Sequence, residues 1–189
     1  MYIYLLTYPL LGAGLKYIDD AFDKKTFNKK FALILAPLLG ILWVYTMFIN
    51  QFSATILFAI MLGVALRGKI DNYAHLAGTL VIVAIIPFIG LSLMVIPLIF
   101  LATAAFLDEF GNDLVDNYLS KHENISFSKK FLKTFFDQRW MTKIAVLYVV
   151  LLGVFPIYFF LAIILFDLAY FSVKSYSNRQ QTTAQPVKA

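Results

Sequence analysis

The charged residues of this chain are confined to four islands, and the sequence between the islands carries no formal charge. All 16 basic and all 11 acidic residues lie within residues 16–30, 67–71, 108–143 and 167–188. Hydrophobic residues make up 61% of the chain and charged residues 14%, which is far more apolar than a soluble domain with a polar surface. The sequence therefore predicts an all-α integral membrane protein.

The uncharged stretches are long enough to hold pairs of helices. Residues 31–66 exceed one span of about 20 residues and are interrupted by polar residues near Asn50, so they are predicted to form a helical hairpin. Residues 72–107 are predicted to form a second hairpin, with its turn near Gly90. Residues 144–166 could be one long helix or a third hairpin, and Gly153 and Pro156 within them favour the hairpin.

We therefore predict a polytopic bundle of about seven membrane spans, which forms a single transmembrane domain over residues 1–174. With seven spans every charged island falls on one side, and the excess of Lys and Arg marks that side as cytoplasmic and the N-terminus as outside. Six spans are the alternative, with residues 144–174 as one tilted helix, which would place basic C-terminal residues outside. Residues 175–189 are polar and are predicted to form a disordered cytoplasmic tail. The predicted spans are residues 1–18, 31–49, 52–67, 72–89, 92–109, 142–155 and 157–174.

The first and third islands share a sequence pattern. Residues 19–23 precede residues 26–31, and residues 112–116 precede residues 126–131, so that both copies fit (D/N)-D-x-x-D followed by (T/S)-F-(N/S)-K-K-F. A duplication would give three spans, one linking span and three more spans, as in many membrane carriers and enzymes. The alternative is that acidic and basic residues recur because loops are polar. The predicted halves are residues 1–67 and 92–174, and the linking span is residues 72–89.

Seven acidic residues crowd the ends of the predicted spans. Spacings of three and four would place several of these carboxylates on shared helical faces, where like charges repel unless a cation neutralises them. An all-oxygen ligand set suits Mg²⁺ or Mn²⁺, and Mg²⁺ commonly completes its shell with substrate phosphate. The alternative is that they are solvated loop residues paired with lysines. The candidate metal ligands are Asp19, Asp20, Asp23, Asp108, Glu109, Asp113 and Asp116.

Two other pairs of residues have a spacing that suits chemistry at the same surface. Asp71 and His75 are four residues apart, so the carboxylate could orient the imidazole for proton transfer, or the two could be joint ligands. A hydrogen-bonded structural histidine is the alternative. Arg139 and Lys143 have the same spacing and could clamp a phosphate. Their alternative role is to anchor the helix at the membrane interface together with Trp140.

Asp167 is an acidic residue in an otherwise apolar segment, between Phe166 and Leu168. A carboxylate at that depth is costly unless it is paired, so we expect it to be buried and to face the bundle interior. Pairing for packing alone is the alternative to a functional role.

Composition and motifs exclude several classes of function. The chain has no cysteine, which rules out disulfides, thiolate metal sites and cysteine nucleophiles. It also lacks a P-loop, a G-x-S-x-G motif and an H-E-x-x-H motif. The net charge of +5 is explained by loop lysines at a membrane surface, so no nucleic-acid partner is expected.

The acidic motifs have a counterpart in a known family. Residues 112–116 resemble the first part of the N-D-x-x-D-x-x-x-D signature of the UbiA polyprenyl transferases, and residues 19–23 are similar to either acidic motif of that family. Such motifs bind Mg²⁺ and an isoprenyl diphosphate there, so the resemblance implies a metal-dependent prenyl transferase. Ser120 stands where the last aspartate of the signature would be, and seven predicted spans compare with nine in the family. The charged islands also resemble small archaeal multi-pass membrane proteins, a likeness that implies no activity.

These observations lead to three functional hypotheses. The first is a membrane enzyme that uses Mg²⁺ or Mn²⁺ and acts on an isoprenoid or other lipid phosphate or diphosphate at the cytoplasmic face. The second is an ion or small-solute transporter built from two three-span repeats. The third is a non-catalytic membrane scaffold. In each case the lipid bilayer is the expected partner.

Overall fold

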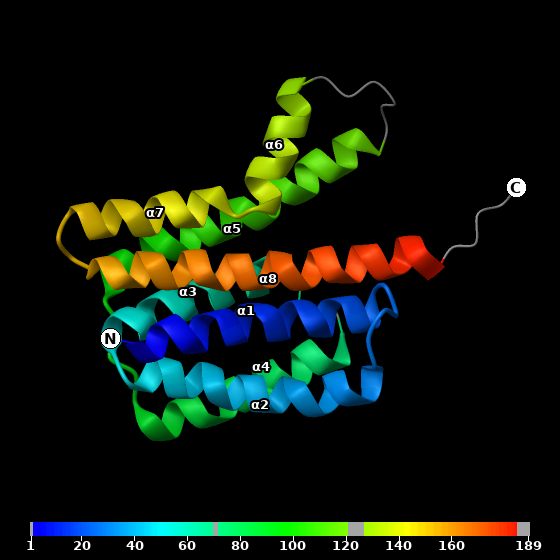
Figure 1. The fold of residues 1–189 in the computed structure, drawn as a ribbon. Helices are drawn as coiled ribbons and strands as arrows, with labels where there is room; N and C mark the ends of the chain where they lie inside the picture. Colours follow the sequence, from blue (N-terminus) through cyan, green and yellow to red (C-terminus); the bar gives the residue numbers. More distant parts are fainter. Residues whose placement is uncertain (1, 70–71, 121–126, 185–189) are drawn as a thin grey trace, which may run out of the picture. The chain divides into compact units, whose positions relative to one another are not determined.

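The computed structural model describes residues 2–69, 72–120 and 127–184 (Figure 1). Within these ranges the chain forms eight α-helices and no strand, which confirms the all-α prediction. Asp71, Ser126 of the second repeat copy and residues 185–189 of the predicted tail lie outside the described residues. The helices are α1 (Tyr2–Phe22), α2 (Lys29–Phe48), α3 (Gln51–Leu66), α4 (Tyr73–Ile89), α5 (Val95–Leu119), α6 (Phe127–Asp137), α7 (Trp140–Leu151) and α8 (Ile157–Ala184).

Three helices are long and apolar enough to cross a membrane. They are α2 (Lys29–Phe48), α5 (Val95–Leu119) and the part of α8 over Ile157–Thr183. Three shorter helices, α3, α4 and α7, are also apolar. The chain thus has the length and composition of a membrane-embedded helical protein.

Helix ends coincide with the polar and glycine signals in the sequence. Asn50 caps α3, with its side-chain oxygen accepting a 2.8 Å hydrogen bond from the Phe52 amide. The α4 helix ends at Gly90, whose φ of 62° favours a residue without Cβ. Gly153 adopts the same kind of conformation between α7 and α8. Residues 144–166 therefore form two helices and not one.

The described residues divide into two compact units. The first unit contains α1, α2, α4 and the part of α8 from Leu161 onward. The second contains α3, α5, α6, α7 and the first residues of α8. Each unit contains helices from both predicted repeat halves. The two units therefore do not coincide with the predicted halves, residues 1–67 and 92–174.

In the first unit, α1 packs on α2, and α2 packs on α4. Gly12 of α1 lies so close to α8 that a Cβ atom there would be 2.1 Å from the carbonyl oxygen of Phe166. A Cβ atom on Gly40 of α2 would likewise be 2.7 Å from the carbonyl oxygen of Gly78 of α4. Small residues at such contacts let helix backbones approach closely, as is typical of helices that pack within membranes.

In the second unit, α5 is the central helix, in contact with α3, α6 and α7. A Cβ atom on Gly63 of α3 would be 2.6 Å from that of Ala105 of α5, so this contact also depends on a small residue. Leu57 of α3, Leu101 of α5 and Val146 of α7 are fully buried. The unit therefore has an apolar core of its own.

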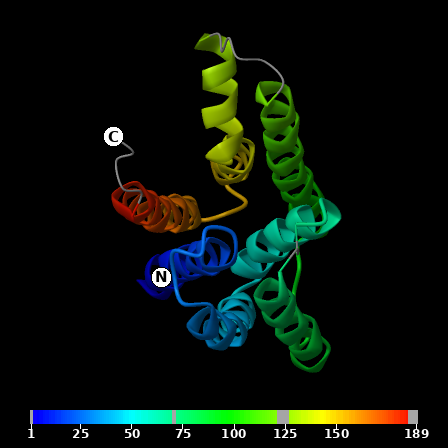
Figure 2. The same cartoon turned by 90° about the vertical axis from the view of Figure 1, so that its right-hand side faces the viewer.

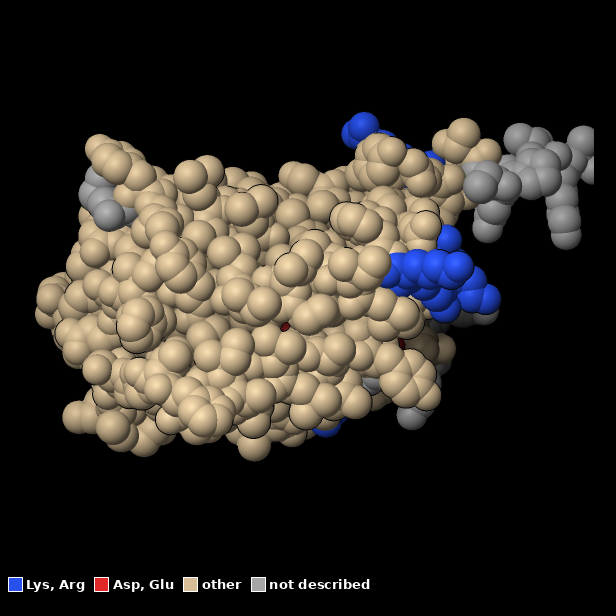
Figure 3. All heavy atoms as spheres, turned by 90° about the horizontal axis from the view of Figure 1, so that it is seen from below, with Lys and Arg blue, Asp and Glu red and all other residues tan. Residues whose placement is uncertain are grey.

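Many large apolar side chains point outward. Examples are Ile34, Phe88 and Ile96, with Phe88 89% exposed. On the face drawn in Figure 3, most of the visible Lys and Arg atoms lie toward the end where α1 finishes and α2 starts, and most of the remaining surface is neither acidic nor basic. An exterior of this kind suits contact with lipid better than contact with water.

The C-terminal segment differs from the expectation. Residues 175–184 are helical and continue α8, whereas a disordered tail was predicted from residue 175. The reason is that this part of α8 contacts the segment after α1. Ser177 is fully buried and donates to Thr26 Oγ1 at 3.2 Å, and Asn178 Oδ1 accepts a 2.7 Å hydrogen bond from Lys24 Nζ.

The two copies of the predicted repeat start different kinds of helix. The first K-K-F leads directly into α2, a candidate membrane span. The second lies in α6, an 11-residue helix that ends at Asp137, before α7 begins. The shared sequence pattern therefore starts a helix in each case, but the helices differ in length and burial.

Candidate functional site

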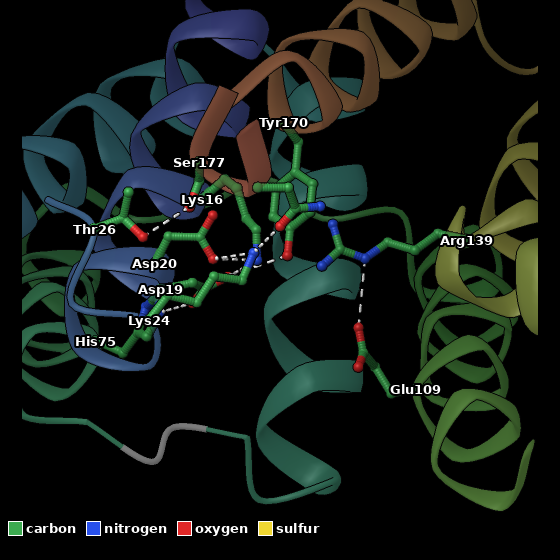
Figure 4. Close-up of polar contacts among 11 residues, drawn as sticks. Lys16, Asp19, Asp20, Lys24, Thr26, His75, Glu109, Arg139, Tyr170 and Ser177 are labelled. Carbon is green, nitrogen blue, oxygen red and sulfur yellow. Dashed lines mark hydrogen bonds and ion pairs between the residues drawn. The ribbon is translucent and has the colours of Figure 1, made fainter. Parts of the chain in front are cut away.

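Three helices of the first unit meet at the carboxylate of Asp19 (Figure 4). Asp19 lies in the last turn of α1, and its Oδ1 atom is 2.5 Å from Nε2 of His75, in the first turn of α4. Its Oδ2 atom accepts a 3.1 Å hydrogen bond from the hydroxyl of Tyr170, on α8. Lys16 Nζ is 3.9 Å from the same oxygen. We call Lys16, Asp19, Asp20, Lys24, His75 and Tyr170 the α1 cluster.

The helix start at α4 fixes the position of His75. Asn72 caps this helix, and its side-chain oxygen accepts a 2.9 Å hydrogen bond from the His75 amide. The His75 side chain is 17% exposed, so it is accessible from outside the cluster. The carboxylate of Asp19 contacts Nε2 and so holds the orientation of the imidazole ring.

Asp19 lies just beyond the predicted span 1–18 and keeps its charge. Burial alone would raise the pKa of its carboxyl, but the hydrogen bond and charge of His75, together with Lys16 and Tyr170, outweigh burial and lower this pKa below 3.8. At neutral pH Asp19 is therefore an ionised acceptor.

Asp20, the next residue, is completely buried. Its Oδ1 atom is 3.1 Å from the ammonium groups of both Lys16 and Lys24, which lie one turn before and one turn after it on the same chain segment. Two cations around one buried carboxylate compensate the cost of removing that charge from water. The α1 cluster therefore combines an acid–histidine pair with two lysines.

A second group of charges lies in the other unit, around the C-terminal half of α5; we call it the α5 cluster. Lys69 Nζ is 2.7 Å from Glu109 Oε2 and 3.0 Å from Asp113 Oδ1. Arg67 Nε donates to Asp113 Oδ2 at 2.7 Å. Arg139 Nε is 3.4 Å from Glu109 Oε1 (Figure 4). Each of these carboxylates is thus matched by two basic side chains.

Lys69 lies between α3 and α4, outside the helices. Burial by itself would lower the pKa of its ammonium group, but hydrogen bonds and ion pairs with Glu109 and Asp113 outweigh burial and raise this pKa above 10.5. Lys69 therefore stays charged across the neutral range and links the two acids.

Asp108 caps a helix in the structure. Its carboxylate accepts hydrogen bonds from the Met141 amide at 3.0 Å, the Thr142 amide at 2.7 Å and the Thr142 hydroxyl at 2.7 Å. These donors are in the first turn of α7, so an acid from α5 satisfies the amides at the start of the neighbouring helix. With three donors bound, its oxygens face protein groups and not a shared ligand position.

Arg139 and Lys143, the predicted phosphate clamp, make separate contacts in the structure. Arg139 precedes α7 and adopts a left-handed conformation with φ of 52°, so helical spacing does not relate it to Lys143. Lys143 Nζ donates to the carbonyl oxygen of Gln138 and lies over the ring of Trp140. The two basic side chains are therefore used separately within the unit.

The other candidate residues have separate environments. Asp116, on α5, is paired at 2.9 Å with Lys133 of α6, and both side chains are about half exposed. Asp23 follows the end of α1. Asp167 is 6% exposed within α8. The predicted pair of Asp71 with His75 lies partly outside the described residues, since Asp71 is not described; among the described residues, Asp19 contacts His75.

The predicted metal ligands are divided between the two units. Asp19 and Asp20 contact lysines in the first unit, and Glu109, Asp113 and Asp116 contact lysine or arginine in the second. The part of the chain that the structure describes contains no group of three or more acidic or histidine side chains placed to hold an ion. Binding of Mg²⁺ or Mn²⁺ by these carboxylates stays a prediction.

Comparisons of this chain with protein-family models, with curated proteins and with solved structures give no match. The chemistry open to the chain therefore follows from the geometry of its own residues. An ionised carboxylate that orients a partly exposed imidazole suits proton transfer, and lysines beside it suit binding of an anion.

Proposed function

We propose that this chain is a multi-pass membrane enzyme that acts on an isoprenoid or other lipid phosphate or diphosphate. The observation that supports this proposal most directly is the contact between Asp19 and His75 at the end of α1, with Lys16 and Tyr170 beside it. It unites a candidate general acid–base residue with a cation in one place.

The proposed arrangement in the membrane has seven spans, with the charged islands on the cytoplasmic side and the N-terminus outside. Three candidate spans and three shorter apolar helices support it, as do helix ends at Asn50, Gly90 and Gly153. A 3+1+3 repeat remains part of the proposal, supported by the shared sequence pattern. The excess of Lys and Arg in the islands supports the orientation.

The roles within the α1 cluster follow from its contacts. Asp19 orients His75 through Nε2, so His75 would exchange a proton with the substrate through Nδ1. Lys16 and Lys24 would bind the phosphate through their ammonium groups. Its oxygens would compete for these donors with the Asp20 carboxylate, which lies 3.1 Å from both. The apolar outer surface and the surrounding bilayer would accommodate the lipid chain.

Mg²⁺ or Mn²⁺ enters this proposal as an ion carried by a diphosphate substrate. Mg²⁺ typically binds one or two carboxylates and completes its shell with water and substrate phosphate. Basic side chains lie beside five of the acids, so no ion held by the protein alone is proposed; these acids are Asp19, Asp20, Glu109, Asp113 and Asp116.

The test is turnover by the full chain reconstituted in nanodiscs. The substrates would be a panel of radiolabelled polyprenyl phosphates, polyprenyl diphosphates and phospholipids, each with Mg²⁺, Mn²⁺ or EDTA. We expect His75→Gln to reduce turnover by about 10²-fold or more, and the matched change of the other histidine, His122→Gln, to leave turnover unchanged. Equal turnover by the two variants would contradict the assignment of His75.

A transporter is the second candidate, and Asp167 is the observation that favours it. Its carboxylate is 6% exposed inside a candidate membrane span, where an ionisable residue often marks an ion pathway. Uptake of an ion or small solute into proteoliposomes that is lost in Asp167→Asn, with no turnover of any lipid phosphate, would favour transport over the enzyme.

A further inference from the structure

The α6 helix carries aromatic side chains on one side, and two of them are largely exposed. Phe127, Phe131 and Phe135 are spaced by four residues and so lie on one side of the helix. Phe127 is 85% exposed and Phe131 is 60% exposed, and no residue of α6 is buried. Leu132 extends this surface and is also exposed.

The opposite side of α6 holds the helix against α5. Lys133 pairs with Asp116 at 2.9 Å, and Lys129 Nζ donates to the Tyr118 hydroxyl at 2.7 Å. The Phe136 ring packs on α5 at Gly111, where a Cβ atom would be 2.4 Å from the ring. Figure 2 shows α6 beside the end of α5. Contacts with α5 thus fix which side of α6 points outward.

The charge of α6 identifies what would cover its aromatic side. Lys129, Lys130 and Lys133 lie within five positions, and Asp137, at the end, is the helix's acidic residue. Aromatic residues on one side and lysines on the other are typical of helices that lie in a membrane interface. Lysine stems reach along apolar surface and place their ammonium groups near lipid phosphates.

The location of α6 in the chain also supports contact with the lipid headgroups. It follows α5, a candidate span whose outer residues include the exposed Leu114, and it precedes α7, which carries the exposed Ile144. A helix between two lipid-exposed helices of its own unit is in a position to meet the headgroup layer.

We propose that α6 is an interfacial helix that binds the anionic surface of a lipid leaflet. Phe127, Phe131 and Leu132 insert below the headgroups. Lys130 selects lipids with a net negative headgroup, together with Lys129 and Lys133 when their ammonium groups exchange Tyr118 and Asp116 for lipid phosphates. This binding surface is independent of the α1 cluster and of the proposed enzymatic activity.

Insertion can be measured with a single tryptophan in the full chain. Trp43→Phe and Trp140→Phe provide the background, Phe131→Trp is the reporter, and Lys133→Trp is the matched control. The control position is about 200° further around the helix, at 100° per residue, and its side chain is half exposed. Nanodiscs with one protein copy and acyl-chain-brominated lipid would be compared with discs of the same lipid without bromine.

We expect bromine to quench the Phe131→Trp reporter at least threefold more than the Lys133→Trp control. Equal quenching of the two positions would overturn insertion. Insertion would also be overturned if the reporter were shielded from water only in discs that hold two protein copies, because a second copy would then cover this side of α6. If Phe131→Trp does not retain the far-UV circular dichroism of the parent, Phe127→Trp replaces it as reporter.

Lipid selection is measured by energy transfer from the Phe131→Trp reporter to a dansyl lipid present at a low mole fraction. We expect transfer to dansyl-phosphatidylglycerol to exceed transfer to dansyl-phosphatidylcholine severalfold, and this preference to disappear in a variant with Gln at positions 129, 130 and 133. Gln at positions 25, 29 and 30 removes the same charge elsewhere and should retain the preference. Equal transfer to both lipids in the parent protein would overturn lipid selection by α6.

Discussion

Replacing Asp108 should destabilise the fold through loss of a helix cap. The carboxylate is 1% exposed and accepts three hydrogen bonds from the first turn of α7. Asp108→Ala leaves three buried donors without their acceptor. Loss of a cap costs about 0.5–2 kcal/mol, and an unsatisfied buried donor costs about 1–3 kcal/mol. Because water and local relaxation recover part of this cost, we expect a total of about 2–4 kcal/mol.

Thermal unfolding in nanodiscs, followed by far-UV circular dichroism, measures this loss. For a chain of this size 1 kcal/mol corresponds to about 2–4 °C in Tm, so Asp108→Ala should lower Tm by about 5–15 °C. Asp108→Asn keeps one carbonyl acceptor and should lose about half as much. The matched control is Asp116→Ala, which removes a half-exposed ion pair worth about 0–1 kcal/mol.

A double-mutant cycle separates the cap from other effects of the substitution. Thr142→Val removes one of the three donors, so it should couple to Asp108→Ala with about 1 kcal/mol. If Asp108→Ala unfolds at the same temperature as Asp116→Ala, or if the cycle shows no coupling, Asp108 does not cap α7 and its assignment as a cap is wrong.

Three other predictions concern packing and pH. Gly12→Ala places a methyl group 2.1 Å from the Phe166 carbonyl oxygen, so α8 must move and Tm should fall by the equivalent of about 1–3 kcal/mol; an unchanged Tm would contradict this helix contact. Because the folded-state pKa of Asp19 is lowered, its contribution to stability is present above pH 3.8 and is lost as pH falls further, so Asp19→Asn should show a smaller loss of Tm on acidification. Because the pKa of Lys69 is raised, its contribution is present below pH 10.5 and is lost as pH rises through the folded pKa, so Lys69→Met should flatten the alkaline limb of the Tm profile.

Local signals allowed the helix boundaries to be predicted. Asn50, Gly90 and Gly153 act on the backbone next to them, through a cap or a positive φ, and the helices end at these residues. The charged islands likewise predicted where acidic and basic side chains gather. Information of this kind is contained in a few consecutive residues, so a single sequence is sufficient to read it.

Contacts between distant segments could not be predicted in the same way. His75 contacts Asp19 across 56 positions, and only the packing of the helices within the first unit decides that partner. The helix over residues 175–184 is held by Lys24 and Thr26, more than 150 positions away, whereas its polar composition alone indicated disorder. Arg139 shows a third limit of sequence spacing. Its distance of four residues from Lys143 suggested that the two share a helical face, but α7 begins at Trp140, so Arg139 precedes the helix.

The central claim is that His75, oriented by Asp19, transfers a proton during turnover of a lipid phosphate. Chemical rescue tests this claim most directly. His75→Gly is assayed in nanodiscs with and without added imidazole, on the polyprenyl phosphate or diphosphate that the parent protein turns over fastest. The account predicts that the variant loses turnover and that imidazole restores a measurable part of it, with His122→Gly unaffected by either change. Full turnover by His75→Gly in the absence of imidazole would contradict the account.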